Sequence, residues 1–462
     1  MTVIQMQKNN LLTEVREFLK LAIPLASAQV AQSATGFADT VMMGRMGADV
    51  LAAGGLAAIT FLCIMMTASG AAMGVSPLIA EAFGAGQKIR VEQIARQGLW
   101  LSVLVAIPAM LFTGHIDILL SRTGQTETTV QLANIYLDIM LWGLLPAVGF
   151  AALRATVSAL SQARPIMLIV VSGTAFNIVW NYILGFGKFG FPEMGLAGLA
   201  LASVITLWGM FLALVLYILT NKNLKHYRIF QELHRVKPRI LKELTWVGIP
   251  IGLFSGLETG FFMVITFWMG LLGTEVLAAH QIVFQTIVVV FMVPLGNSYA
   301  TTVRVGQWLG RRERTGIQQA ALVSMSITTA FMMGVSIVFL LFPKSIIGLY
   351  IDITNPANAN IVAIALPLLM VAAIAQVLDG FQKAVYGSLQ GLQDTQIPML
   401  LNVLGYWGVG LSAGYVLGFQ WQMGGIGLWI GQSVAIAVVA GLFIWRFWQL
   451  MKHQKFSRST QP

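Results

Sequence analysis

The chain has 462 residues, of which 57% are hydrophobic and only 10% are charged, and its mean hydropathy is +0.78. Soluble proteins carry about 25% charged residues, so this composition excludes a cytosolic enzyme and predicts an integral membrane protein. The net charge of +10 comes from basic residues scattered over loops. This pattern indicates membrane topology and anionic lipid headgroups, and it argues against a nucleic-acid interface.

Apolar windows of about 20 residues predict an all-α membrane protein with twelve transmembrane helices. The expected spans are 18–42, 49–80, 97–115, 129–155, 166–186, 195–220, 245–271, 275–306, 317–342, 357–390, 397–418 and 425–448. Several of them exceed the necessary length, so we expect tilts and bends. Pro24 and Pro250 are the candidate helix bends that occupy equivalent places in the two halves of the chain.

The basic residues orient this bundle. With the N-terminus inside, all but four of the 28 Lys and Arg residues, Lys383 among them, are expected to face the cytoplasm. The four exceptions are Arg45, Arg122, Lys188 and Lys344. The asymmetry predicts a multi-pass protein of the inner cell membrane with both termini in the cytoplasm.

The sequence repeats itself at an offset of about 226 residues. VREFLKLAIP, which ends at Pro24, matches LKELTWVGIP, which ends at Pro250, and GADVLAA at 47–53 matches GTEVLAA at 273–279. Each half then holds six helices in the same orientation, so the fold class predicted is two six-helix lobes related by a pseudo-two-fold axis along the membrane normal. The expected domains are an N-terminal lobe 1–220, a basic cytoplasmic linker 221–244, a C-terminal lobe 245–450 and a cytoplasmic tail 451–462.

Acidic residues inside the spans are the strongest functional candidates, because a charge at bilayer depth costs about 2.5–3.5 kcal/mol on insertion scales. Glu258 and Asp379 lie clearly inside predicted spans, and Asp39 lies in the first span. No basic residue is expected deep enough to neutralise them, so each should bind a proton, a metal cation or a cationic substrate. Glu81 and Asp138 lie nearer to span ends and are weaker candidates.

Asp39 has a set of polar partners of its own. Asn177 and Asn181 are four residues apart, so they share one helical face, and Ser203 lies on the next helix. These oxygens are ligands that a small cation such as Na+ prefers. The alternative interpretation is interhelical hydrogen bonding that holds the bundle together.

A further group of polar and aromatic residues in the second half could line a substrate cavity through apolar and cation–π contacts. For any single one of them, ordinary packing is the simpler interpretation, and this includes the histidine. The group consists of Phe261, Phe262, Trp268, His280, Gln281, Phe284 and Gln285.

The chain has no G-x-x-x-x-G-K-[ST] motif, and no loop is long enough for a nucleotide-binding domain. We therefore expect no ATP hydrolysis and no cofactor, and any pumping should use an ion gradient. An intramembrane enzyme is a rival interpretation, and the sequence argues against it because no His/Asp metal set and no nucleophile with its base is evident.

FADTVMMG, GADVLAAGG, FGAGQ and the repeated VLAAHQ together resemble the multidrug and toxic compound extrusion (MATE) family, and the acids in GLETGFF and VLDGFQ resemble its NorM branch. The resemblance covers essentially the whole chain. It implies a monomeric antiporter, coupled to Na+ or H+, that exports organic cations and lipophilic drugs.

The resemblance leaves the coupling ion open. In some members an aromatic residue four positions before the acid of the tenth helix contacts the ion, whereas this chain has Ala375 there. A flippase of a lipid-linked precursor is the alternative function, and it would need a cationic cavity where this sequence offers acids.

Overall fold

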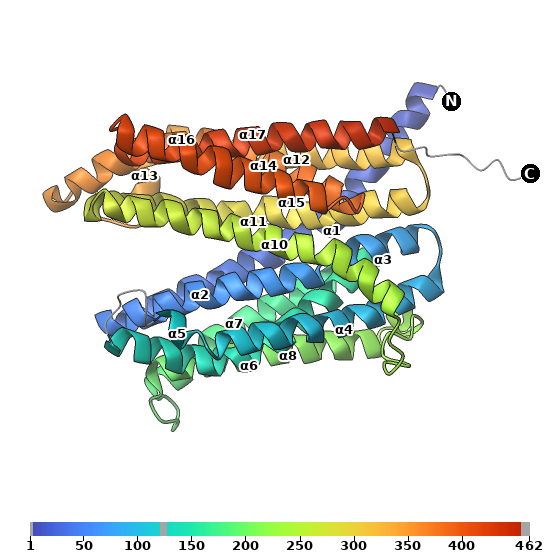
Figure 1. Cartoon of the computed structure of the whole chain (residues 1–462), viewed down its shortest axis with the longest axis horizontal. Helices are drawn as coiled ribbons and strands as arrows, with labels where there is room; N and C mark the ends of the chain where they lie inside the picture. The colour runs from blue at the N-terminus through green and yellow to red at the C-terminus, as the bar shows by residue number, and fades with distance from the viewer. Residues whose placement is uncertain (1–2, 121–126, 454–462) are drawn as a thin grey trace, which may run out of the picture. The chain divides into compact units, whose positions relative to one another are not determined.

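The structure is a computed structural model that describes residues 3–120 and 127–453 (Figure 1). Within these ranges the chain forms helices joined by turns and contains no β-strand. Residues 121–126, which include Arg122, and residues 454–462 of the predicted tail lie outside the described residues.

The helices of the first half and the linker are α1 (Val3–Met46), α2 (Ala48–Ala72), α3 (Val75–Gly84), α4 (Lys88–Thr113), α5 (Asp117–Leu120), α6 (Glu127–Ala159), α7 (Arg164–Phe186), α8 (Gly195–Thr220) and α9 (Lys222–Lys225). Those of the second half are α10 (Pro238–Leu271), α11 (Thr274–Gly310), α12 (Arg314–Leu341), α13 (Pro343–Ile347), η2 (Pro356–Asn358), α14 (Ala359–Gly391), α15 (Gln396–Asn402), η3 (Val403–Gly410), α16 (Leu411–Tyr415), η4 (Val416–Gln420) and α17 (Gly424–His453).

The predicted fold class is confirmed. Among the described residues, 11 helices are long and apolar enough to cross a membrane, with α2 and α3 counted together and the 396–420 stretch counted as one. Helix α1 covers the remaining predicted span. Its apolar stretch is interrupted by Gln29 and Gln32, which explains why it is less hydrophobic than the others. The protein is an all-α, multi-pass membrane protein.

Contacts divide the chain into two compact units. The N-unit consists of residues 27–256, and the C-unit consists of residues 1–26 and 257–462. The division falls inside α1 and inside α10, so each of these helices contributes residues to both units. Residues 1–26 of the predicted N-terminal lobe thus belong to the C-unit, and residues 245–256 of the predicted C-terminal lobe belong to the N-unit.

Helix α6 is the centre of the N-unit, where it packs against α2, α4 and α8, while α7 packs against α8. Its buried Tyr136, Leu137, Met140 and Leu144 join a cluster with residues of α2 and α8. Because lipid tails are as apolar as these side chains, the cluster is stabilised by van der Waals packing between the helices and not by removal from water.

Small residues bring α10 close to the α2–α3 segment within the N-unit. Gly70 and Gly74 are four residues apart, and so are Gly248 and Gly252. A Cβ added at Gly70 would lie 2.9 Å from the Cα of Gly252, and one added at Gly74 would lie 2.5 Å from the Cα of Gly248. This reciprocal pattern is the small-residue packing by which membrane helices approach each other closely.

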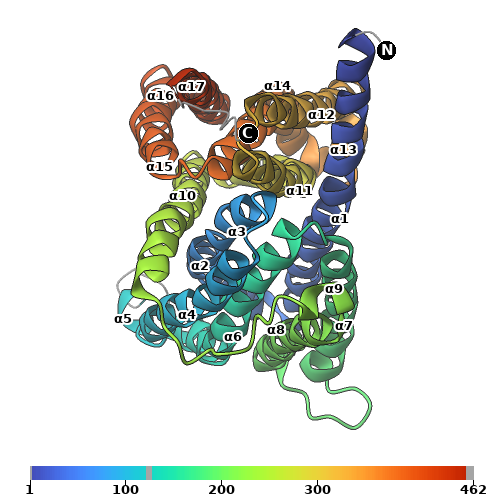
Figure 2. The same cartoon turned by 90° about the vertical axis from the view of Figure 1, so that its right-hand side faces the viewer.

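Helix α14 is the centre of the C-unit and packs against α11, α12 and α17. Figure 2 shows α14 end-on among these three helices. The segment from α15 to η4 packs against α17 and includes two π-helical stretches, η3 and η4. Polar residues in the middle of α14 are therefore enclosed by other helices.

The internal repeat is visible in the backbone. Gly47 precedes α2 with φ 130° and ψ 164°, and Gly273 precedes α11 with φ 126° and ψ 161°. This conformation is accessible essentially only to glycine. Two copies of the same rare turn at equivalent positions support the predicted duplication.

Candidate functional site

An ion pair between α10 and α14 forms the core of the candidate site in the C-unit. Lys383 Nζ donates to Glu258 Oε1 at 2.5 Å and to Oε2 at 2.6 Å. The Lys383 side chain is 2% exposed and that of Glu258 is 14% exposed. The Phe291 ring of α11 has its centroid 5.1 Å from Nζ, within range of a cation–π contact. Three helices therefore hold one buried ammonium group.

This pair corrects two expectations from the sequence. Lys383 does not face the cytoplasm, and Glu258 is not without a basic partner. Lys383 lies eight residues before Gly391, the last residue of α14, which is about 12 Å along a helix. A lysine at this depth often extends its side chain toward the membrane surface. Here the helices around α14 direct it to a carboxylate.

Asp379 adds a second carboxyl group one turn before Lys383 on α14. It is buried, with 7% exposure, and it interacts electrostatically with both Lys383 and Glu258. With both carboxyl groups ionised, the two acids and one ammonium carry a formal net charge of −1. The three residues, which we call the C-unit triad, can thus be neutralised by one monovalent cation.

The π-helical segment η3 encloses the triad with two aromatic residues. Tyr406 Oη donates to Gln382 Oε1 at 2.9 Å, and Gln382 precedes Lys383 on α14. Trp407 Nε1 donates to the backbone carbonyl of Leu257 at 3.0 Å, next to Glu258. These contacts hold the Gln382 side chain beside Lys383 and the Leu257 backbone beside Glu258.

Several of the predicted substrate-lining aromatics form one cluster. The Phe261 ring lies 4.9 Å from Tyr406 and 5.6 Å from Phe262. Phe262 lies 6.0 Å from Phe284, which stacks on His280 at 5.6 Å. This aromatic cluster reaches the triad through Tyr406.

The other predicted lining residues lie differently. His280 is buried, its Nε2 lies 3.0 Å from Thr266 Oγ1, and its Nδ1 has no hydrogen-bond partner among the described residues. Trp268 packs against Tyr415 and Phe419 instead of the aromatic cluster. Gln281 and Gln285 are exposed.

The N-unit brings together the predicted polar set around Asp39. Asn181 Nδ2 donates to Asp39 Oδ1 at 2.5 Å and to Asn177 Oδ1 at 3.0 Å. Asn177 Nδ2 donates to Ser203 Oγ at 3.2 Å and to Thr206 Oγ1 at 3.4 Å. Three helices, α1, α7 and α8, thus supply one hydrogen-bonded group, which we call the Asp39 network.

The Asp39 network has unused capacity for a cation. Asn181 Oδ1 is buried without a hydrogen-bond partner, and in the described part of the chain Asp39 forms no salt bridge within the N-unit. The carboxylate, this orphan amide oxygen and Asn177 Oδ1 are hard oxygen ligands of the kind that suits a small cation. With Asp39 ionised, the network carries a net charge of −1.

The remaining sequence candidates do not join either group. Glu81 lies 3.6 Å from Arg90, near the ends of α3 and α4, and Asp138 is exposed. Pro24 and Pro250 lie inside α1 and α10, where each removes one backbone hydrogen-bond donor.

Sequence reasoning missed Lys383, Gln382, Tyr406 and Trp407. The available signal was the position of Lys383 in the same span as Asp379, one helical turn away. No sequence pattern marked the η3 residues, because their role depends on how that helix packs against α10 and α14.

Carboxylates held among polar partners inside the membrane-spanning helices of both units are typical of a multi-pass membrane transporter. The family model MatE matches residues 24–183 and 250–416. The chain therefore belongs to the multidrug and toxic compound extrusion family, and it is a transporter and not an enzyme.

The names of curated relatives agree with this family assignment. The chain is 53% identical over 442 residues to a probable multidrug resistance protein NorM of Synechocystis, covering 96% of each chain. It is 38% identical over 429 residues to the multidrug resistance protein NorM of Burkholderia vietnamiensis, covering 93% of this chain and 92% of that one.

Solved structures share the fold. A crystal structure of a MATE protein in complex with MaL6 superposes with a TM-score of 0.86 at 23% identity, covering 95% of this chain and 97% of that one. The eukaryotic MATE transporter AtDTX14 gives a TM-score of 0.84 at 22% identity, with 97% of both chains covered.

Proposed function

We propose that this chain is a cation-coupled antiporter that exports organic cations and other lipophilic drugs from the cytoplasm across the inner cell membrane. The names of the relatives as multidrug resistance proteins support the substrate class. The basic-residue asymmetry supports an orientation with both termini in the cytoplasm.

The observation that carries the proposal is the charge of the two sites. The C-unit triad and the Asp39 network each have one negative charge more than their described partners neutralise. A permanent uncompensated charge in a membrane segment is costly, so each site should hold a cation for at least part of the transport cycle. A site whose charge changes in this way can couple ion entry to drug exit.

The coupling follows from competition for the same carboxylates. A drug cation and a coupling cation cannot both be held at full strength by a single negative charge. Binding of a proton or Na+ from outside therefore weakens the hold on the drug and favours its release. Ligands can shift a two-state carrier only through such differential affinity.

Lys383 bears on the identity of the coupling ion in the C-unit. Its ammonium group already occupies both oxygens of Glu258, so a metal ion would have to displace it. A proton needs only one oxygen, and Asp379 supplies it. We therefore propose H+ for the C-unit triad, whereas the oxygen set of the Asp39 network suits either H+ or Na+.

The energetics are adequate. A tenfold gradient of a monovalent ion provides about 1.4 kcal/mol, and 100 mV provides about 2.3 kcal/mol per net charge moved. For one cation exchanged against a neutral drug both contribute, and about 3.7 kcal/mol sustains a drug gradient of roughly 500-fold.

Ethidium efflux from membrane vesicles, with proton and sodium gradients imposed separately, tests the proposal. The proton gradient should drive efflux, and Asp379→Asn should abolish that drive, because the C-unit triad then has no net charge. Asp138→Asn, at an exposed acid of similar type, is the matched control and should transport normally. Equal efflux without either gradient would contradict antiport.

A further inference from the structure

A basic cavity lies in the N-unit where the first turns of α4 and α10 meet. Its volume is about 1140 Å³, and the basic side chains that line it are Lys88, Arg90, Arg239 and Lys242. Both helices begin here, on the side of the membrane where most basic residues of the chain are expected. The cavity is separate from the Asp39 network.

The cavity keeps an excess of positive charge. Its lining contains four basic residues and one acid, Glu243, so its formal charge is +3. Arg90 lies 2.7 Å from Glu243 and 3.6 Å from Glu81, which neutralises that one guanidinium. Within the described part of the chain, the one ion pair of Lys88 is a 4.0 Å contact with Glu92.

Arg239 and Lys242 are exposed and form no ion pair with the described residues of the N-unit. Surface cations usually find an acidic partner or solvent, and a single one would mean little. Here Arg239 and Lys242 line the same cavity as Lys88. This arrangement suits a ligand that carries phosphate.

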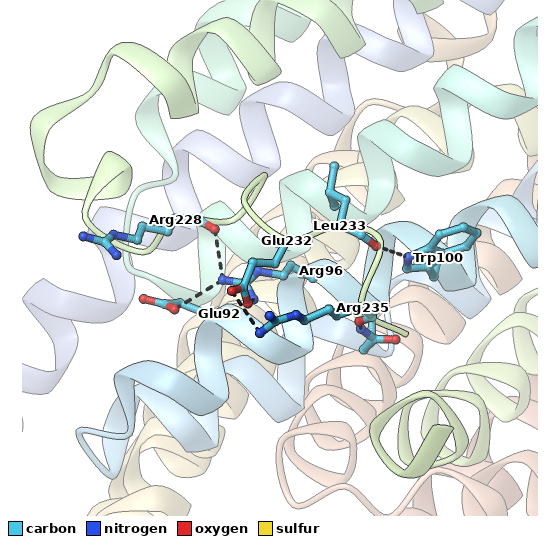
Figure 3. Close-up of polar contacts among 8 residues, drawn as sticks. Glu92, Arg96, Trp100, Arg228, Glu232, Leu233 and Arg235 are labelled. Carbon is cyan, nitrogen blue, oxygen red and sulfur yellow. Dashed lines mark hydrogen bonds and ion pairs between the residues drawn. The ribbon is translucent and has the colours of Figure 1, made fainter. Parts of the chain in front are cut away.

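The linker that precedes α10 is held against α4 by polar contacts (Figure 3). The Arg96 guanidinium lies 3.3 Å from Glu232 Oε2 and 3.5 Å from Glu92 Oε2, and it donates to the Arg228 carbonyl at 3.3 Å. The buried Arg96 of α4 thus fixes the position of the middle of the linker.

The end of the linker is held by two further side chains of α4. Trp100 Nε1 donates to the Leu233 carbonyl at 2.7 Å. Gln97 accepts from the Lys237 amide at 3.0 Å and donates to the Arg235 carbonyl at 3.0 Å. The start of α10 is therefore positioned beside the start of α4 before any ligand binds, which reduces the entropy cost of binding.

The rim of the cavity is apolar. Ile89 is 69% exposed and Trp246 is 65% exposed, and both line the cavity. Tryptophan is enriched at the membrane–water interface, where its ring lies at the level of the headgroups. The lining thus combines cations, which suit phosphate, with an exposed tryptophan, which suits acyl chains, and these are the two ends of a phospholipid.

We propose that this cavity binds the headgroup of an anionic phospholipid, with the phosphodiester between Lys88, Arg239 and Lys242 and the upper acyl chains against Trp246. Basic pockets of this kind between membrane helices recognise anionic headgroups. Because the linker joins the two halves of the chain, the bound lipid would stabilise the junction at which α10 begins.

The test uses the full-length chain in detergent and counts bound lipid by native mass spectrometry. The probes are dioleoylphosphatidylglycerol, dioleoylphosphatidylcholine and inorganic phosphate. The variant Arg239→Gln with Lys242→Gln removes two charges from the cavity. The matched control, Lys222→Gln with Lys225→Gln, removes two charges from exposed positions of α9.

We expect phosphatidylglycerol to bind at least tenfold more tightly than phosphatidylcholine, and the cavity variant to remove this preference while the control keeps it. Trp246→Ser should weaken phosphatidylglycerol binding about threefold or more without restoring phosphatidylcholine binding. Three results would overturn the proposal: equal losses in both double variants, no difference between the two lipids, or inorganic phosphate displacing phosphatidylglycerol at equal concentration.

Discussion

Replacing Glu258 by glutamine tests the role of the buried ion pair. The amide keeps the size of the side chain and removes its charge. In place of the two carboxylate oxygens at 2.5 and 2.6 Å, Lys383 then has at most one neutral amide oxygen, while its side chain stays 2% exposed. Removing one partner of a buried pair costs about 3–5 kcal/mol. We expect the lower end, about 3 kcal/mol, because Asp379 and the Phe291 ring remain close to the ammonium.

The same change alters the charge of the C-unit triad. Glu258→Gln takes the triad from −1 to 0, so it should stop binding the coupling cation and drug efflux should stop. Adding Lys383→Met restores the charge to −1 through Asp379 and removes the stranded ammonium. The double variant should therefore be more stable than Glu258→Gln and should regain part of its gradient-driven efflux.

Two measurements decide this prediction: the thermal unfolding midpoint of the purified chain, and ethidium efflux from proteoliposomes with a proton gradient. Combining Glu258→Gln with Lys344→Met, at an exposed lysine of α13, is the matched control and should rescue neither property. If the Lys383→Met double variant were no more stable and no more active than Glu258→Gln, the charge reasoning would be wrong.

Three other changes follow from the structure. Asp39→Asn should leave the protein folded and reduce the number of cations moved per drug, measured as proton or sodium uptake during efflux; an unchanged ratio would count against the Asp39 network. Gly252→Val should push α10 away from Ala71 of α2 and destabilise the N-unit by about 1–3 kcal/mol, which a lower thermal unfolding midpoint would show. Gly209 has open space around it, so Gly209→Val should be tolerated. Pro24→Ala should preserve ethidium binding and slow efflux, since it removes a site of helix bending, and unchanged turnover would show that the proline is only tolerated.

The helices and the Asp39 network could be predicted from the sequence because both depend on local periodicity. Spans follow from apolar length, and Asn177 and Asn181 share a face because they are four residues apart. Ser203 on the next helix was part of the same prediction, and the structure adds Thr206 as a further partner of Asn177. Gly47 and Gly273 similarly share one backbone conformation because the same short motif was duplicated.

The C-unit triad could be predicted only in part. Acids in apolar segments are visible in any sequence, so Glu258 and Asp379 were identified. The direction of Lys383 was not, because a lysine two turns from a helix end reaches water in one packing arrangement and a carboxylate in another. That choice depends on the helices around α14, which lie far from it in the sequence.

The domain boundaries show the same limit. An internal repeat predicts where the two halves of the sequence begin and end. It does not predict with which compact unit each end of a long helix packs. Helices α1 and α10 both continue across the division of the units. Their assignment depends on tertiary contacts such as those between Gly70 and Gly252.

The central claim is that each unit has one uncompensated carboxylate, so that two monovalent cations enter for each monovalent drug cation that leaves. Such exchange moves one net charge and responds to the membrane potential. The most direct measurement is ethidium transport in proteoliposomes with the potential set by valinomycin and potassium and with no proton or sodium gradient. The account predicts potential-driven ethidium movement that disappears in Asp39→Asn. Ethidium transport by the wild-type chain that does not change with the membrane potential would contradict it.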